Sequence, residues 1–288
     1  MIKKGIILAG GHGTRMSPLT KAVNKQLLPV YDKPLIFYPL SILMLAGIKD
    51  ILIIVNKGQL SEFKKILPNG NSLGIKIEYL QQKNPGGLPE AFIIGEKFIG
   101  KDNVALILGD NFFYGQSLTE KLRKCIKLKK GAKVFLYPVN NPSQYGIAEI
   151  KNNKIKKIVE KPKKPFSNLA ITGLYFFDNS VVKFSKQLKP SKRNEIEIVD
   201  LLKKYKSKSK LSAEFIGRGA AWLDAGSIKD FYEASSFVAA IENRQGQKIG
   251  CLEEIALRNN WINKKSLLSS IKFYGKCEYS NYLSKLIK

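Results

Sequence analysis

The chain opens with Lys3-Lys4-Gly5-Ile6-Ile7-Leu8-Ala9 and runs directly into Gly10-Gly11-His12-Gly13-Thr14-Arg15. The first stretch predicts a strand, and α/β folds place their ligands beyond the carboxyl ends of strands. The glycines that follow allow a tight turn and bring several backbone N–H groups against phosphate oxygens. Arg15 adds a charged, planar fork for the same oxygens. This stretch predicts an α/β fold with a phosphate site over its first turn.

Two common phosphate motifs are excluded at this turn. No Gly-Lys-Ser/Thr follows, so the stretch is not a P-loop, and Met16 stands where a dinucleotide fingerprint has its third glycine. A glycine-rich turn by itself also fits a simple connection between a strand and a helix. A second cation, Lys25, follows ten residues after Arg15 and can reach the same site from the far side of the loop. The two cations favour a binding site.

Outward from this turn, the first half alternates apolar β-rich runs with helical patterns. We expect strands at residues 5–9, 51–55, 76–80, 104–108 and 133–139, and helices at residues 34–46, 59–67, 88–98 and 118–128. Pro34 fits the first turn of its helix, where a missing N–H costs nothing. The alternation predicts a mostly parallel sheet with right-handed crossovers.

The second half changes character. Residues 146–150 and 154–159 flank Lys151-Asn152-Asn153 and predict a hairpin, and a further strand is expected at residues 170–177. After Asp224, helical patterns dominate, at residues 228–243, 252–259, 264–270 and 277–286. No shift of composition marks a linker. We therefore expect one domain, residues 1–288, with an α/β core, inserted β structure and a helical C-terminal part.

The composition indicates a soluble protein from a reducing compartment. No apolar run approaches the roughly 20 residues that a membrane helix needs, and no signal peptide is evident. Cys125, Cys251 and Cys277 are isolated and fit neither a CxxC site nor an even disulfide framework. We expect a cytoplasmic protein without a membrane partner.

The net charge of +26 has two interpretations. It could attract an anionic partner such as nucleic acid, or it could be a solvated lysine surface. The excess is almost all lysine, is spread along the chain, and lacks aromatic interleaving or a nucleic-acid motif. We favour the solvated surface and expect no nucleic-acid partner. The field would still help to draw in triphosphates, and salt would weaken it.

The turn at residues 10–15, together with Lys25-Gln26-Leu27-Leu28-Pro29, resembles the signature of the sugar-nucleotide pyrophosphorylases. The resemblance implies a Rossmann-like nucleotidyltransferase core whose loop wraps a nucleoside triphosphate. It implies that Arg15 and Lys25 neutralise charge on the departing pyrophosphate. The loop residues carried over from the family are Leu8, Gly10, Gly11, Gly13 and Thr14.

Two further segments resemble the metal-binding parts of this family. They are Leu108-Gly109-Asp110-Asn111 and residues 217–226, which contain Asp224. A single Asp after a strand is often only a turn residue. Two of them within matching segments favour Mg²⁺, which binds a few carboxylates together with substrate phosphate oxygens. The resemblance thus implies Asp110 and Asp224 as metal ligands and catalytic residues.

The sugar phosphate is expected to bind in the middle of the chain. Glu160 would hold hexose hydroxyls, Lys161 would face the substrate phosphate, and Arg193 resembles a second phosphate ligand. Lys161 could instead be a solvated lysine beside Lys163 and Lys164; its place between Glu160 and Pro162 favours function. The remaining sugar-binding residues that the resemblance implies are Asn111, Tyr145, Gly146, Ile171 and Thr172.

The base is expected to contact Gln26, Gln82 and Gly87. A glutamine amide both donates and accepts, so it can match the O4 and N3–H edge of thymine or uracil. The sequence departs from the family here, because Gly87-Leu88-Pro89-Glu90-Ala91 stands where relatives typically have Gly-Leu-Ala-Gln-Ala. Glu90 thus replaces an amide by an anion. His12 is the only histidine, and we assign it no general-base role, since a sugar phosphate is already an anionic nucleophile.

Residues 242–246 and 250–256 resemble the short bacterial thymidylyltransferases. That group is tetrameric, with a second, regulatory nucleotide site, and supplies deoxysugar routes such as rhamnose synthesis. The resemblance implies the Mg²⁺-dependent reaction of dTTP with α-D-glucose 1-phosphate, giving dTDP-glucose and pyrophosphate. It divides the domain into a nucleotide half (1–140), a sugar-phosphate half (141–226) and an oligomerisation part (227–288). UTP or another sugar phosphate as substrate, and a non-catalytic nucleotide-binding regulator, remain alternatives.

Overall fold

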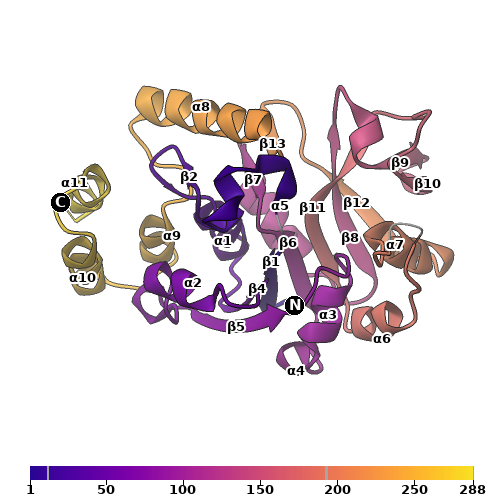
Figure 1. Cartoon of the computed structure of the whole chain (residues 1–288), viewed down its shortest axis with the longest axis horizontal. Helices are drawn as coiled ribbons and strands as arrows, with labels where there is room; N and C mark the ends of the chain where they lie inside the picture. Colours follow the sequence, from indigo (N-terminus) through magenta and orange to yellow (C-terminus); the bar gives the residue numbers. More distant parts are fainter. Residues whose placement is uncertain (12, 192–193, 288) are drawn as a thin grey trace.

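The computed structural model describes residues 1–11, 13–191 and 194–287, and its centre is a mixed sheet covered by helices (Figure 1). Within these residues, nine strands form the sheet, with β10-β9-β11-β6-β1-β4-β5 as its main path and β8 linking β11 to β12. β1 pairs in parallel with β4 and β6, and β4 pairs in parallel with β5. The parallel strands are β1 (Lys4–Ala9), β4 (Asp50–Asn56), β5 (Lys76–Gln82) and β6 (Val104–Leu108). The predicted α/β core is confirmed.

The inserted β structure joins the sheet through one long strand, β11 (Leu169–Phe177), which runs antiparallel to β6, β8 and β9. The predicted hairpin is present as β9 and β10, and Asn152 and Asn153 have φ of 51° and 57°, as a type I′ turn requires. The other strands of this region are β8 (Ala132–Pro138), β9 (Gly146–Lys151), β10 (Lys154–Glu160) and β12 (Leu211–Phe215).

Two small ribbons lie outside the main sheet. β7 (Asn111–Gly115) pairs with β13 (Ala220–Asp224), and β2 (Pro29–Val30) pairs with β3 (Lys33–Pro34). The second ribbon corrects the expectation for Pro34, which lies in β3 and not in the first turn of a helix. The helix begins only at Phe37 because the chain first turns back at Tyr31 and Asp32 to pair Lys33 with Val30.

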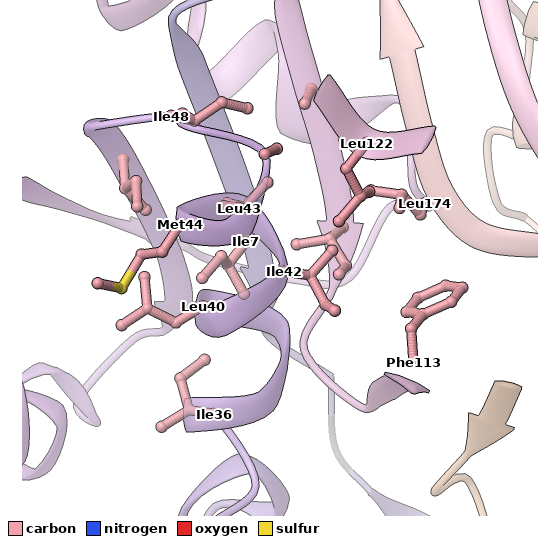
Figure 2. Packing of buried hydrophobic residues seen from close by; sticks show 14 of the residues in the cluster. Ile7, Ile36, Leu40, Ile42, Leu43, Met44, Ile48, Phe113, Leu122 and Leu174 are labelled. Atoms are coloured by element: carbon pink, nitrogen blue, oxygen red, sulfur yellow. The ribbon is translucent and has the colours of Figure 1, made fainter. Parts of the chain in front are cut away.

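Helices cover both faces of the sheet, so its central strands β1, β4 and β6 are apolar on both sides. Ile7 and Ile53 pack beneath α1 (Phe37–Leu45), whose Leu40 and Leu43 point toward the strands (Figure 2). The other face packs on a second cluster with α3 and α7. The remaining helices of this part are α2 (Leu60–Ile66), α3 (Glu90–Ile94), α4 (Glu96–Ile99), α5 (Leu118–Cys125), α6 (Ser180–Lys186) and α7 (Ile198–Ser207). The helix expected at 88–98 is split at Gly95, a residue that is unfavourable in a helix interior.

The C-terminal part is helical, as predicted. α8 (Ile228–Gln245) begins at Ser227, whose hydroxyl accepts the Asp230 N–H, and ends at Gly246 in the left-handed conformation. α9 (Leu252–Arg258) packs against α1, and α10 (Lys264–Tyr274) pairs with α11 (Glu278–Lys285) beyond it (Figure 1). All three cysteines are free thiols, and Cys125 and Cys251 are buried. Across the described residues no helix has the length and apolar character to cross a membrane.

Candidate active site

The opening turn is held by side chains from the ends of the neighbouring strands. The Gly11 N–H donates to Asn56 Oδ1 (2.9 Å), and Asn56 Nδ2 donates to the Gly11 carbonyl (2.8 Å). Gln82, at the end of β5, lies so close to Gly10 that a Cβ at residue 10 would overlap its amide. The carboxyl ends of β1, β4 and β5 therefore meet at this turn, where a ligand is expected in an α/β fold.

The two cationic side chains that are predicted to bind phosphate lie on the same side of the sheet. Lys25 forms an ion pair with Asp110. Its short 3-10 turn is capped by Asn24, whose Oδ1 accepts the Gln26 N–H (2.8 Å). Arg15 reaches the segment that contains Asp224, because a Cβ at Gly226 would lie 3.0 Å from Arg15 Nη2. Segments that are far apart in the chain thus converge on one place.

The two predicted metal carboxylates are brought together by the β7–β13 ribbon. Asp224 pairs in register with Asn111, the neighbour of Asp110, and the Ala225 N–H donates to the Asp110 carbonyl (3.0 Å). Burial acts to raise the pKa of Asp110, but the charge of Lys25 and the hydrogen bonds from Lys25 and Asn111 together hold this pKa below its ordinary value. Burial and the charge of Asp110 raise the pKa of Asp224 to about 7, against the opposing charges of Lys25 and Arg15. One carboxylate is stably ionised and its neighbour is close to its midpoint at neutral pH.

This pair fits a divalent cation. No group of three or more His, Cys, Asp or Glu side chains that could hold a metal occurs among the described residues. An ion here would have two carboxylates and would take its other oxygens from substrate or water, which is the coordination that Mg²⁺ accepts. A cation would also relieve the repulsion that raises the pKa of Asp224.

Asn111 is the residue that orients Asp110. Its Nδ2 donates to Asp110 Oδ1 (3.1 Å), while its Oδ1 accepts from the Gly173 N–H (3.0 Å) and from Trp222 Nε1 (2.6 Å). The Asn111 side chain is buried, at 1% exposure. Its amide oxygen is therefore engaged within the protein, and only the second amide hydrogen is left for the predicted sugar contact.

The predicted sugar segment lies beside β13. Gly146 pairs with Glu160 across the hairpin, and the Lys161 N–H donates to the Tyr145 carbonyl (3.0 Å). The Tyr145 ring packs edge-on against Trp222, with centroids 5.1 Å apart. Burial, followed by the charge of Asp224, raises the pKa of Tyr145. These contacts connect the sugar segment to the metal segment.

Four members of the predicted sugar set need separate comment. Lys161 is exposed, with φ of +41°, and Ile171 is buried. Thr172 is fully buried. Arg193 lies outside the described residues.

Two predicted ligands hold buried polar atoms that have no hydrogen-bond partner among the described residues. They are Gln26 Oε1, in a side chain at 3% exposure, and Thr172 Oγ1. A buried acceptor without a partner costs about 1–3 kcal/mol, so such atoms indicate a ligand or a water molecule.

A cleft of about 350 Å³ opens over the turn. Most of the predicted nucleotide ligands line it: Leu8, Gly10, Gly11, Gly13, Thr14, Arg15, Lys25, Gln82 and Gly87, together with Asp110. Pro85, Leu88 and Glu195 also line it and were not predicted. Pro85 and Leu88 flank Gly87 in the sequence and could have been included, whereas no pattern distinguishes Glu195. Asn56 was also missed, although its place at the end of a strand was a usable indication.

Comparison with known proteins agrees with this arrangement. The profile of the Nucleotidyl transferase family matches residues 4–241. The glucose-1-phosphate thymidylyltransferase of Neisseria meningitidis is 52% identical over 286 residues, covering 99% of both chains, and that of Mycobacterium tuberculosis is 44% identical with the same coverage.

Solved structures share the fold. A structure assigned as a glucose-1-phosphate thymidylyltransferase from Bacillus anthracis, in complex with a sucrose, has a TM-score of 0.76 at 38% identity, covering 81% of this chain and 94% of the other. A UDP-glucose pyrophosphorylase complexed with UDP-glucose has a TM-score of 0.73 at 29% identity, covering 85% and 100%. The chain therefore belongs to the nucleotidyl transferase family and, within it, to the group of the glucose-1-phosphate thymidylyltransferases.

Proposed function

We propose that this protein converts dTTP and α-D-glucose 1-phosphate into dTDP-glucose and pyrophosphate with the help of Mg²⁺. One observation supports this most directly: the glycine turn, Lys25 and the carboxylates Asp110 and Asp224 meet at one edge of the sheet. Relatives that carry the thymidylyltransferase name match along the whole chain. The protein acts as an enzyme of the nucleotidyltransferase class.

The nucleotide binds over the opening turn. Backbone N–H groups of the turn contact the phosphates, and Gln26, Gln82 and Gly87 contact the base. Arg15 and Lys25 stabilise the charge that develops on the departing pyrophosphate. Lys25 pairs with Asp110, and both residues line the cleft over the turn.

Asp110 and Asp224 hold the metal, with Asn111 keeping the Asp110 carboxylate in place. Mg²⁺ supplies neutralisation of charge on the α-phosphate. The sugar phosphate oxygen attacks the α-phosphorus, and pyrophosphate leaves in line. Because this nucleophile is already an anion, the protein contributes positioning and fixed charges and not a general base.

The sugar phosphate binds on the β9–β10 side of the cleft. Glu160 holds hexose hydroxyls, and Lys161 and Arg193 bind the phosphate. Replacing Lys161 by Ala should lower kcat/KM for glucose 1-phosphate about 10²-fold or more, the usual cost of losing a preorganised charge contact. Lys163→Ala, two residues away, is the matched control and should leave kcat/KM near that of the wild type.

One assay tests the whole proposal. The protein is given dTTP, UTP, ATP and GTP separately, each with glucose 1-phosphate and Mg²⁺, and pyrophosphate release is measured. The proposal expects turnover with dTTP at the highest kcat/KM. Preferred use of UTP would select the alternative that the UDP-glucose pyrophosphorylase structure favours. No pyrophosphate from any nucleotide would contradict the enzyme class.

The remaining assignments are part of the same proposal. Residues 1–140 serve the nucleotide, residues 141–226 serve the sugar phosphate, and residues 227–288 serve assembly into a homotetramer with a second, regulatory nucleotide site. The large apolar Tyr232 is 73% exposed on α8, which supports a role of this part in assembly. Sedimentation velocity would show a species of four chains. The cytoplasmic location stays a prediction.

A further inference from the structure

Glu90 turns back onto the loop that precedes it. The helix α3 begins at Glu90, and its Oε2 accepts the Gly86 N–H at 2.8 Å. The carboxyl group lies against the α-carbon of Gly86, because a Cβ there would be 2.8 Å from Oε2 and 3.0 Å from Cδ. The contact needs both residues: an acceptor at residue 90 and no side chain at residue 86.

The same loop is fixed on its other side by a separate segment of the chain. The Gly86 carbonyl accepts the Ile196 N–H (2.8 Å). Gly87 has φ of +103°, and a Cβ there would overlap the Ile196 carbonyl. The two glycines are thus held between Glu90 and Ile196. Gly87, and the neighbours Pro85 and Leu88, line the nucleotide cleft.

Consecutive glycines are the most flexible part of a chain, and ordering them on binding costs affinity. A hydrogen bond to a charged acceptor is about twice as strong as one to a neutral acceptor. A carboxylate has only acceptor atoms, whereas a glutamine amide can present either an acceptor or a donor to the same N–H. Glu90 therefore holds this loop in one conformation before any ligand arrives.

We propose that Glu90 is a positioning residue for the nucleotide base. Glu90 acts by fixing the peptide groups of Gly86 and Gly87 at the wall of the cleft. The inference rests on the proposed function, since it takes the occupant of the cleft to be a nucleotide. It assigns Glu90 no contact with the reacting atoms. Its loss should weaken nucleotide binding and leave the chemical step unchanged.

The test compares Glu90→Ala, Glu90→Gln and the matched control Glu96→Ala. Glu96 is an exposed carboxylate on the next helix and pairs with Lys186. For Glu90→Ala we expect the KM for dTTP, and the Kd for dTTP in calorimetry without sugar phosphate, to rise about tenfold, the cost of one charged hydrogen bond. The kcat and the KM for glucose 1-phosphate should stay within about twofold. Glu90→Gln should restore most of the affinity, and Glu96→Ala should match the wild type.

A second variant covers the case in which Glu90→Ala does not fold. In Gly86→Ala the new methyl group displaces the Glu90 carboxyl group while that group is retained, so the same rise in KM and Kd for dTTP is expected. Unchanged dTTP affinity in both variants, or a fall in kcat with KM unchanged, would overturn the inference. Failure of the proposed function has a different signature, since the wild type itself would then release no pyrophosphate, and the Kd for dTTP would still test Glu90.

Discussion

At the scale of single residues, the proposed metal site depends on two carboxylates in different electrostatic surroundings. Lys25 and Asn111 hold Asp110 as an anion, whereas burial and the charge of Asp110 raise the pKa of Asp224 to about 7. We predict that Asp110→Asn lowers kcat/KM about 10²-fold or more, because the substitution removes a negative charge that would bind the metal ion beside the reacting phosphate. Pyrophosphate release by purified protein measures this. Near-normal turnover would remove Asp110 from the mechanism.

The raised pKa of Asp224 predicts how stability depends on pH. The folded protein binds this proton more tightly than the unfolded chain does, so the stability contribution is complete below about pH 4 and is lost as the pH rises through about 7. We therefore compare the unfolding free energy of the Asp224→Asn variant with that of the wild type. The difference in favour of the variant should grow by about 2 kcal/mol between pH 5.5 and 8, or roughly 4–8 °C in Tm.

Thermal unfolding of both proteins without metal tests this, with Glu120→Gln as the control for an exposed first-turn carboxylate of α5. Adding Mg²⁺ at pH 8 should raise the Tm of the wild type and leave the Asp224→Asn variant almost unchanged. A Tm difference that does not vary with pH would mean that Asp224 titrates normally.

At the scale of single residues, much of the candidate site could be predicted from the sequence. The glycine turn, both cations and both aspartates are marked by residue type and by their place after apolar runs, and the structure brings them together. Asn56 holds the glycine turn and was not foreseen: its place at the end of a strand was an indication, but its partner Gly11 lies 45 residues away in the chain. The hydrogen bonds that the Asn111 side-chain oxygen accepts could likewise not be predicted from the sequence, since their donors are Gly173 and Trp222, far away in the chain.

At the scale of elements, the position of Asp110 depends on how β11 passes beside β7. The pairing of β11 with β8 shifts between Ile171 and Tyr175, and within this irregular stretch Gly173 approaches Asn111. We predict that Gly173→Ala lowers kcat about tenfold or more, because its methyl group would lie 2.5 Å from Asn111 Oδ1 and would displace the amide that orients Asp110.

Steady-state kinetics with varied Mg²⁺ tests this, and the apparent Mg²⁺ requirement should rise with the loss of kcat. Trp222→Phe removes only the other donor to the same oxygen and should have a smaller effect in the same direction. An active Gly173→Ala enzyme with wild-type Mg²⁺ dependence would show that the Asn111 contact is dispensable.

The elements themselves were predicted unevenly. Strands with continuous Ile, Leu and Val runs, such as β1 and β4, were found because burial on both faces leaves a strong apolar pattern. The helix α7 was missed although Ile198, Leu201, Leu202 and Tyr205 follow its period; its many lysines obscured the pattern. The ribbon of β7 and β13 could not be deduced, because its strands are short and pair across half of the chain.

At the scale of the whole molecule, the charge of +26 belongs to a surface rich in lysine. Such a field raises the rate at which anions arrive and is screened beyond about 8–10 Å at ordinary ionic strength. We predict that kcat/KM for dTTP falls several-fold between about 20 mM and 500 mM NaCl while kcat changes little. The Lys129→Glu, Lys130→Glu double variant, at two exposed sites outside the nucleotide cleft, should reduce this salt dependence. Equal salt effects on kcat and kcat/KM would point to a cause other than steering.

The pairing of β13 with β7 also sets an order of events during synthesis. Asp110 leaves the ribosome with the first half of the protein, but its companion carboxylate arrives only with β13, after the whole inserted β region. A nascent polypeptide that ends before residue 220 therefore has the glycine turn and only one of the two proposed metal ligands. The proposed ion site is completed late, when little more than the helical C-terminal part remains to be translated.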